Sequence, residues 1–249
     1  MTTDAVTGDS EVLTESSEST GAVMSLVEHL SELRNRLIKA GLAVGIGSVV
    51  GFYFNRQIRD VLLLPLPGHT VQVLNPGDAF SITVRIAVVT GVILAMPVIL
   101  YQAWAFVAPG LTPRERRAVV PWIPVALVFF ALGIALAWFV LPVAVSFLLS
   151  FTDASLKANL AAGPYFDFVG MMFLAFGLAM QYPIVLFALA RIGVVTSAKL
   201  RSWRRYVLLA IVIVGTALTP PDAFSDIVMS AVLYLLYEVT TFVIARTGR

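Results

Sequence analysis

Acidic side chains are the residues of this 249-residue chain that could support chemistry, because several lie where acids are unexpected. Those that fall in or beside long apolar segments include Glu32, Glu115, Asp226 and Glu238. A carboxylate can bind a guanidinium through paired hydrogen bonds, cap a helix, or carry a proton inside a membrane. The two histidines lie outside these segments, and cysteine is absent. We therefore expect no catalytic residues, no metal site and no cofactor, and predict that the protein is not an enzyme.

Glu32 lies in residues 25–37, whose sequence is SLVEHLSELRNRL. Ser25 and Glu28 have the spacing of a capping box, which predicts that a helix begins here. Leucines at 26, 30, 33 and 37 form one apolar stripe, so Glu32 and Arg36 lie on a polar face of that helix. Because Arg36 follows Glu32 by four residues, the spacing alone favours an ion pair on a hydrated surface over a ligand site.

Glu115 follows an aromatic segment that contains Trp104 and Phe106, which suits the end of a membrane span. Thr112, Pro113 and Glu115 have the spacing of helix positions N-cap, N1 and N3, so a capping role is the simpler interpretation. Glu115 is also the only acid among three arginines in this loop. It is therefore either neutralised by them or held to receive another cation.

The segment 218–226, LTPPDAFSD, predicts a tight connection between two helices. Its two prolines end one helix, and Asp222 is most simply the N-terminal cap of the next. Asp226 and Glu238 lie about 18 Å apart along that next helix. Acids inside a span usually face the protein interior and are functional candidates, whereas acids near the interface are hydrated. For Asp226 the hydrated interpretation is favoured.

Gln181 is an uncharged polar residue near the middle of another apolar segment, two residues before Pro183. A proline frees a backbone carbonyl in the preceding turn of a helix. We expect Gln181 to donate a hydrogen bond to that freed backbone or to a neighbouring helix.

Composition places these residues in a membrane protein. The chain is 59% hydrophobic and 13% charged, whereas soluble domains are about 25% charged. We predict an all-α integral membrane protein, in which residues 25–249 form one domain with six transmembrane helices. The predicted spans are residues 37–55, 79–106, 118–150, 165–190, 205–219 and 224–245.

Two of the charge-free stretches have unusual lengths. Residues 118–152 are long enough to predict a single tilted helix that begins near Pro121 and bends near Pro142. The fifth stretch, residues 206–221, rises only about 24 Å, against a hydrocarbon core of about 30 Å. We expect this short span to thin the bilayer locally or to lie buried beside other helices.

The positive charges predict the orientation. Thirteen of the 17 Lys and Arg residues flank the spans on one side, and the opposite loops hold only Arg56, Arg59 and Lys157. The positive-inside rule then places both termini in the cytoplasm, which requires an even number of spans and agrees with six. Residues 1–24 contain acids but no base, which predicts a disordered cytoplasmic tail rather than a signal peptide. A net charge of +2 gives no indication of a nucleic-acid partner.

Three motifs, in order, resemble the TatC family, the multi-span receptor subunit of the twin-arginine (Tat) protein translocase. They are HLSELR at 29–34, PVILYQAWAFVAP at 97–109 followed by ERR at 115–117, and LTPPD at 218–222. The resemblance runs from about Glu28 to Ala245. It implies a concave, glove-like bundle that binds twin-arginine signal peptides of folded proteins for export driven by the proton-motive force. It also implies assembly with the single-span subunits TatA and TatB.

The resemblance also implies roles for particular residues. Glu32 and Glu115 would bind the arginine pair, with Arg34 and Phe106 as supporting positions. The outer turn of the family corresponds to Pro220, Pro221 and Asp222. Spans 5 and 6 would dock TatA and TatB, which implies docking positions at Thr216, Leu218, Thr219 and Asp226. Some relatives carry a glutamate at the position of Gln181, so we carry over no mechanism that needs a charge there.

We therefore expect a multi-pass protein of the bacterial cytoplasmic membrane that forms homo-oligomers within its complex. The alternative is a proton- or ion-coupled secondary transporter that uses Arg85, Asp226 and Glu238 as buried ionisable groups. It explains the acids inside spans but not the acid-bearing motifs outside them. A third possibility is a structural assembly subunit that binds no signal peptide.

Overall fold

The computed structural model describes residues 9–66, 71–108, 121–152, 160–218 and 222–246. These residues are helical apart from short connections, and the only extended pairing among them is an isolated bridge between Gln72 and Ala161. Several positions named from the sequence lie outside the described residues: Thr112, Pro113, Glu115, Lys157, Thr219, Pro220 and Pro221.

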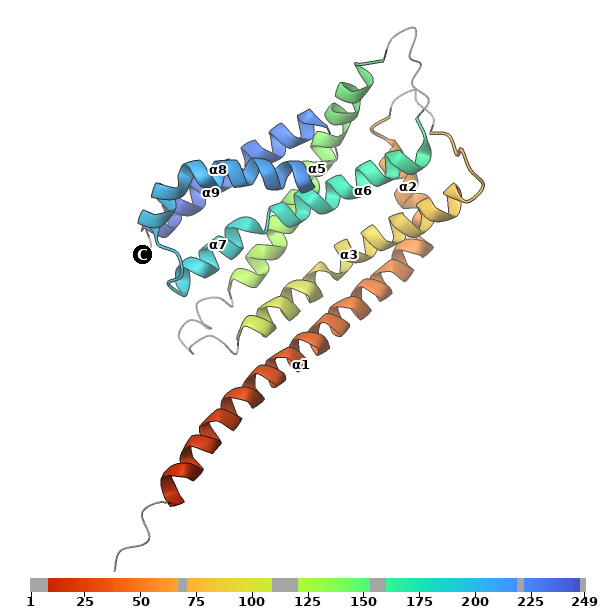
Figure 1. Ribbon diagram of the computed structural model, residues 1–249. Coiled ribbons are helices and arrows are strands. Elements are labelled where there is room, and N and C mark those ends of the chain that lie inside the picture. Colours follow the sequence, from red (N-terminus) through yellow and green to blue (C-terminus); the bar gives the residue numbers. More distant parts are fainter. Residues whose placement is uncertain (1–8, 67–70, 109–120, 153–159, 219–221, 247–249) are drawn as a thin grey trace, which may run out of the picture.

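Helix α1 runs without a break from Asp9 to Tyr53. It begins earlier than Ser25, the start that the capping-box spacing predicts, and its helical backbone enters the segment for which we predict a disordered tail. A helix that already exists extends at little cost, because only nucleation is unfavourable. Figure 1 shows the first half of α1 projecting away from the other helices.

Helix α3 (Asp78–Val107) packs along α1, and glycines make the close approach possible. A Cβ added to Gly91 would lie 2.7 Å from Val44 O, and one added to Gly47 would lie 2.8 Å from Gly91 O. Small residues of this kind let helix backbones touch in membranes. The short helix α2 (Asn55–Leu63), which the sequence analysis did not predict, follows α1 and is tied to α3 by Asn55 Nδ2, which donates to Thr83 O at 2.9 Å.

Helix α5 (Trp122–Leu149) begins directly after Pro121 and contains Pro142. It confirms that the long third stretch is one helix. The predicted fourth span is instead two helices, α6 (Ala162–Ala179) and α7 (Tyr182–Arg191), separated at Met180 and Gln181. Pro183 lies in the first turn of α7, where its missing N–H needs no helical partner, and it cannot donate the hydrogen bond that would continue α6 into α7.

The last two helices are α8 (Ser197–Leu218) and α9 (Ala223–Arg246), which pack on each other. Five helical segments of the described chain are long and apolar enough to cross a membrane, and α8 is not among them. Its first turns carry Lys199, Arg201, Arg204 and Arg205, so its apolar part is residues 206–218. That part rises roughly 20 Å, in agreement with the short fifth span predicted from the sequence.

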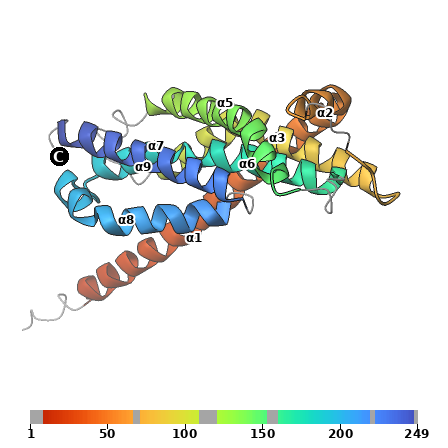
Figure 2. The same ribbon diagram turned by 90° about the horizontal axis from the view of Figure 1, so that it is seen from above.

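The core lies around α6, which contacts both α3 and α5. Met172 and Phe176 of α6 and Leu141 of α5 are completely buried. Figure 2 shows α9 lying between α5 and α8. Helices α1 and α3 therefore form one side of the bundle and α8 and α9 the other, with α6 between them (Figure 1).

Candidate functional site

Glu32 lies where α1 passes the last turns of α3. Its Oε1 accepts hydrogen bonds from Nε of Arg36, at 3.0 Å, and from Nη2 of the same residue. Nη1 of Arg36 lies 3.4 Å from Oε1 of Gln102 on α3. The side chains of Arg36 and Glu32 remain 22% and 30% exposed. The ion pair expected from the spacing is therefore present, and its guanidinium also touches a second helix.

Phe106 lies at the same junction of α1 and α3. Its ring stacks on the imidazole of His29, with centroids 4.4 Å apart and an interplanar angle of 21°. The structure thus brings together Glu32 and Phe106, two of the four positions that the resemblance implies for signal-peptide binding. Arg34 is exposed on α1 and joins none of the ion pairs formed by the described residues.

Gln102 and His29 were not assigned to this site in the sequence analysis. Gln102 lies inside a motif that we quoted, and His29 begins another, but neither motif indicates which residues meet across the helices. Arg36 and Gln102 are 66 positions apart in the chain. Their contact depends on how α1 packs on α3, so it follows from the glycine contacts described above rather than from local spacing.

The junction of α8 and α9 collects a second group of polar side chains. Asp222 is buried and its Oδ1 accepts from Ser225 N at 2.7 Å, which confirms the predicted cap of α9. Thr216 Oγ1 lies 2.9 Å from Oδ2 of Asp226 and also 2.9 Å from Val212 O. Oδ1 of Asp226 and Oγ of Ser230 are buried without a hydrogen-bond partner among the described residues. Asp226 therefore faces α8 rather than the hydrated surface favoured from the sequence.

Glu238 lies near the other end of α9 and is neutralised there. Its Oε2 accepts from Nη2 of Arg204 at 2.6 Å, and its Oε1 accepts from the Tyr234 hydroxyl at 3.1 Å. Tyr237 is fully buried and donates its hydroxyl to Leu200 O at 2.5 Å. These bonds fix the basic start of α8 against the end of α9.

Gln181 lies at the break between α6 and α7. Its Nε2 donates to Ala126 O of α5 at 3.1 Å, which is the bond to a neighbouring helix expected from the sequence. Its Oε1 is buried without a hydrogen-bond partner among the described residues. Gln181 also lines a cavity of about 520 Å³ whose walls come from α6, α7, α8 and α9.

Arg85 of α3 forms an ion pair with Asp167 of α6, and both side chains are about half exposed. This pair was not predicted from the sequence, since Asp167 lies just before a charge-free stretch and 82 positions from Arg85. Arg85, Asp226 and Glu238 each interact with a different partner, at three separate places. They share no partner among the described residues.

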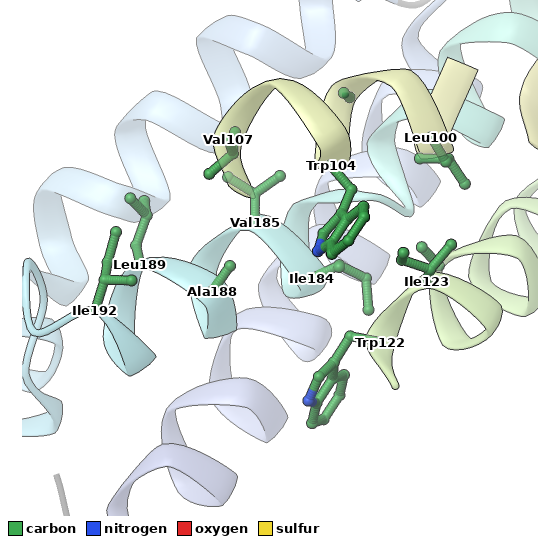
Figure 3. Close-up of a pocket in the computed structure, with 12 residues that line it drawn as sticks. Leu100, Trp104, Val107, Trp122, Ile123, Ile184, Val185, Ala188, Leu189 and Ile192 are labelled. Atoms are coloured by element: carbon green, nitrogen blue, oxygen red, sulfur yellow. The ribbon is translucent and has the colours of Figure 1, made fainter. Parts of the chain in front are cut away.

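An apolar pocket of about 280 Å³ lies between α3, α5 and α7 (Figure 3). Its walls include Trp104 and Val107 of α3 and Ile184 of α7. Trp122, at the start of α5, packs against Phe187 with ring centroids 3.9 Å apart. The end of α3 therefore contacts α1 through Gln102 and Phe106 and faces this pocket with other side chains.

Long apolar helices with charged groups gathered at their ends define a polytopic integral membrane protein. Residues 28–231 match the family model of TatC, the Sec-independent protein translocase protein, and this chain belongs to that family. It is 37% identical to the TatC protein of Carboxydothermus hydrogenoformans over 88% of this chain and 92% of the relative. It is 34% identical to TatC of Escherichia coli K12 over 87% of this chain and 86% of the relative.

The fold agrees with solved TatC structures. A crystal structure of the twin-arginine translocase receptor TatC, determined in DDM, superposes with a TM-score of 0.78 at 37% identity, covering 87% of this chain and 99% of that chain. A second crystal structure of that receptor gives a TM-score of 0.77. The family expected from the three motifs is thus confirmed, and the protein is a component of a Sec-independent protein translocase.

Proposed function

We propose that this chain is the receptor subunit of the twin-arginine translocase and that it binds the arginine pair of signal peptides through Glu32 and Glu115. The observation that carries the proposal is that the Glu32 carboxylate already accepts two hydrogen bonds from a guanidinium group. A planar guanidinium can form paired bonds with a carboxylate that an ammonium cannot copy. Two such acids therefore favour Arg-Arg over Lys-Lys.

The surroundings of Glu32 support this role. The Phe106 ring lies at the same junction of α1 and α3, where it stacks on His29, and aromatic rings can attract arginine side chains. Glu32 is partly buried, which strengthens its interaction with a cation relative to a fully exposed acid. The position of Glu115 relative to Glu32 is part of the proposal, as is the supporting role of Arg34.

The proposed topology has six spans in a concave, glove-like bundle with both termini in the cytoplasm. It is supported by the distribution of Lys and Arg and by the apolar residues 206–218 of α8, which add a short sixth span to the five longer ones. In this orientation Glu32 faces the cytoplasm, where a signal peptide arrives before export. The proposed location is the bacterial cytoplasmic membrane, with transport driven by the proton-motive force.

The proposed partners are the single-span subunits TatA and TatB, docked along α8 and α9. The exposed apolar side chains of Leu209 and Ile213 on α8 support this surface, since a partner helix could pack against them. Thr216, Leu218 and Thr219 belong to the same proposed surface. We also propose that several copies of this chain assemble within the complex.

The test is crosslinking of a twin-arginine signal peptide to the protein in membrane vesicles. The Arg-Arg peptide should crosslink efficiently, and the matched peptide with Lys-Lys should crosslink weakly. Glu32→Gln keeps the size of the side chain and removes its charge, so it should reduce crosslinking of the Arg-Arg peptide. Equal crosslinking of the two peptides by the unaltered protein would contradict the receptor function.

A further inference from the structure

The carboxylate of Glu32 is occupied by a guanidinium of its own chain. Among the described residues, the hydrogen bonds that reach Glu32 come from Arg36, and both end on Oε1. An arginine of a bound peptide would form the same kind of bond with the same carboxylate. The site proposed for the peptide is thus filled, at one of its two oxygens, by an internal arginine.

Arg36 has a second partner to which it can move. Its Nη1 lies 3.4 Å from Oε1 of Gln102, and its side chain is 22% exposed. When Arg36 leaves Glu32, its guanidinium therefore stays within reach of an amide oxygen and of water. Opening the ion pair leaves no buried charge unpaired, so the cost of opening stays low.

We propose that Arg36 is an internal competitor that the arginine of a signal peptide must displace from Glu32. This inference rests on the proposed receptor function and adds a regulatory element to that site. Since the peptide binds only molecules in which the ion pair is open, its apparent dissociation constant equals the intrinsic one divided by the open fraction. For a partly exposed pair one helical turn apart, competition weakens binding about two- to five-fold.

A competitor of this kind lowers the affinity of the site for every signal peptide and leaves the selectivity for Arg-Arg over Lys-Lys unchanged. The ion pair must open before any cationic peptide binds, so Arg-Arg and Lys-Lys peptides lose affinity by the same factor. Selectivity between them comes from guanidinium geometry at the carboxylates. If Arg36 instead contacted the peptide directly, its removal would change the ratio of the two affinities.

The test measures the affinity of labelled Arg-Arg and Lys-Lys signal peptides for the full-length protein in membrane vesicles. Arg36→Gln should tighten binding of both peptides by the same factor, about two- to five-fold. Arg36→Lys keeps the charge but pairs less well with Glu32, so it should give a smaller gain. Lys39→Gln is the matched control, because it removes the same charge from an exposed position on α1. It should change either affinity by less than about two-fold.

A double variant separates competition at Glu32 from a general effect of charge. In the Glu32→Gln background, Arg36→Gln should have no effect, because the competitor has lost the group for which it competes. An equal gain in that background overturns the inference, and so does unchanged or weaker binding by Arg36→Gln with Glu32 intact. Unchanged peptide binding by Glu32→Gln alone would instead overturn the proposed function. The amount of folded protein in the vesicles is measured for each variant, so that affinities refer to folded molecules.

Discussion

Gly47 of α1 and Gly91 of α3 meet backbone to backbone, and a Cβ on Gly47 would lie 2.8 Å from Gly91 O. This contact positions the part of α1 that carries Glu32 and Arg36 against the end of α3 that carries Gln102 and Phe106. A side chain at Gly47 would meet backbone atoms of Gly91, and one at Gly91 would meet the Ser48 hydroxyl and the backbone of Ser48 and Val44, so either would force the helices apart. The peptide site therefore depends on two residues that lie well away from it along the helices.

Gly91→Ala should consequently destabilise the protein by about 1–3 kcal/mol, the usual cost of overpacking. Gly41→Ala is the matched control, since nothing lies within 4 Å of a Cβ at that position of α1. It should cause no loss of stability. The measurement is thermal unfolding of the detergent-solubilised protein, and equal melting temperatures for the two variants would refute the proposed importance of the glycine contact.

The presence of a membrane-spanning helix could be predicted well from the sequence where an apolar segment is long. The predicted span 79–106 corresponds to α3 at Asp78–Val107, and the span 224–245 corresponds to α9 at Ala223–Arg246. A helix that crosses the hydrocarbon core must be continuous, apolar and about 20 residues long, so hydropathy alone predicts the first and last residues of these helices closely. The break between α6 and α7 was not predicted, because hydropathy does not report the backbone hydrogen bond that is missing at Pro183.

The candidate site could be predicted only in part. Local spacing identified the ion pair of Glu32 with Arg36 and the cap formed by Asp222, since both arise within a turn or two of helix. The stack of His29 on Phe106 and the approach of Arg36 to Gln102 join residues from different helices. Such contacts depend on the rotation of each helix about its axis, which packing determines and a single sequence leaves open.

Phe106→Ala should weaken peptide binding by removing the ring that stacks on His29. An aromatic pair contributes about 0.5–1.5 kcal/mol beyond its buried area. We therefore expect a two- to about ten-fold loss of affinity for the Arg-Arg peptide if the ring also positions the peptide. Phe80→Ala is the control, because Phe80 is 70% exposed near the opposite end of α3. An affinity unchanged by Phe106→Ala would exclude Phe106 as a supporting position.

The six-span topology can be tested with single cysteines, because the chain has none of its own. Cysteines introduced as Ser31→Cys, Ser197→Cys and Thr247→Cys should be shielded from a membrane-impermeant thiol reagent in intact cells. Those introduced as His69→Cys and Ser155→Cys should react. The thirteen-to-three distribution of Lys and Arg motivates this pattern. Reaction of Ser197→Cys from outside would contradict the proposed orientation.

Docking of TatA and TatB along α8 and α9 should respond to the size of residue 216. Thr216 lies 2.9 Å from Oδ2 of Asp226, and single hydrogen bonds between membrane helices contribute about 0.6 kcal/mol on average. Thr216→Ala should therefore weaken docking only modestly, whereas Thr216→Trp should block it by bulk. The measurement is site-specific crosslinking from α8 to each single-span subunit. Crosslinks from α1 and α5 without any from α8 would show that the partners dock elsewhere.

Glu115→Gln distinguishes a receptor acid from a helix cap. If Glu115 binds an arginine of the signal peptide, the variant should accumulate normally in the membrane and lose several-fold to a few tens-fold in peptide affinity. If Glu115 only caps a helix, the variant should accumulate less, and the surviving molecules should bind the peptide normally. Membrane abundance and peptide crosslinking, measured on the same preparation, therefore decide between the two roles.

The double variant Glu32→Gln, Glu115→Gln should abolish selection of Arg-Arg over Lys-Lys, because the remaining amides are uncharged. Normal crosslinking of the Arg-Arg peptide by that double variant would show that the arginine pair binds at other residues.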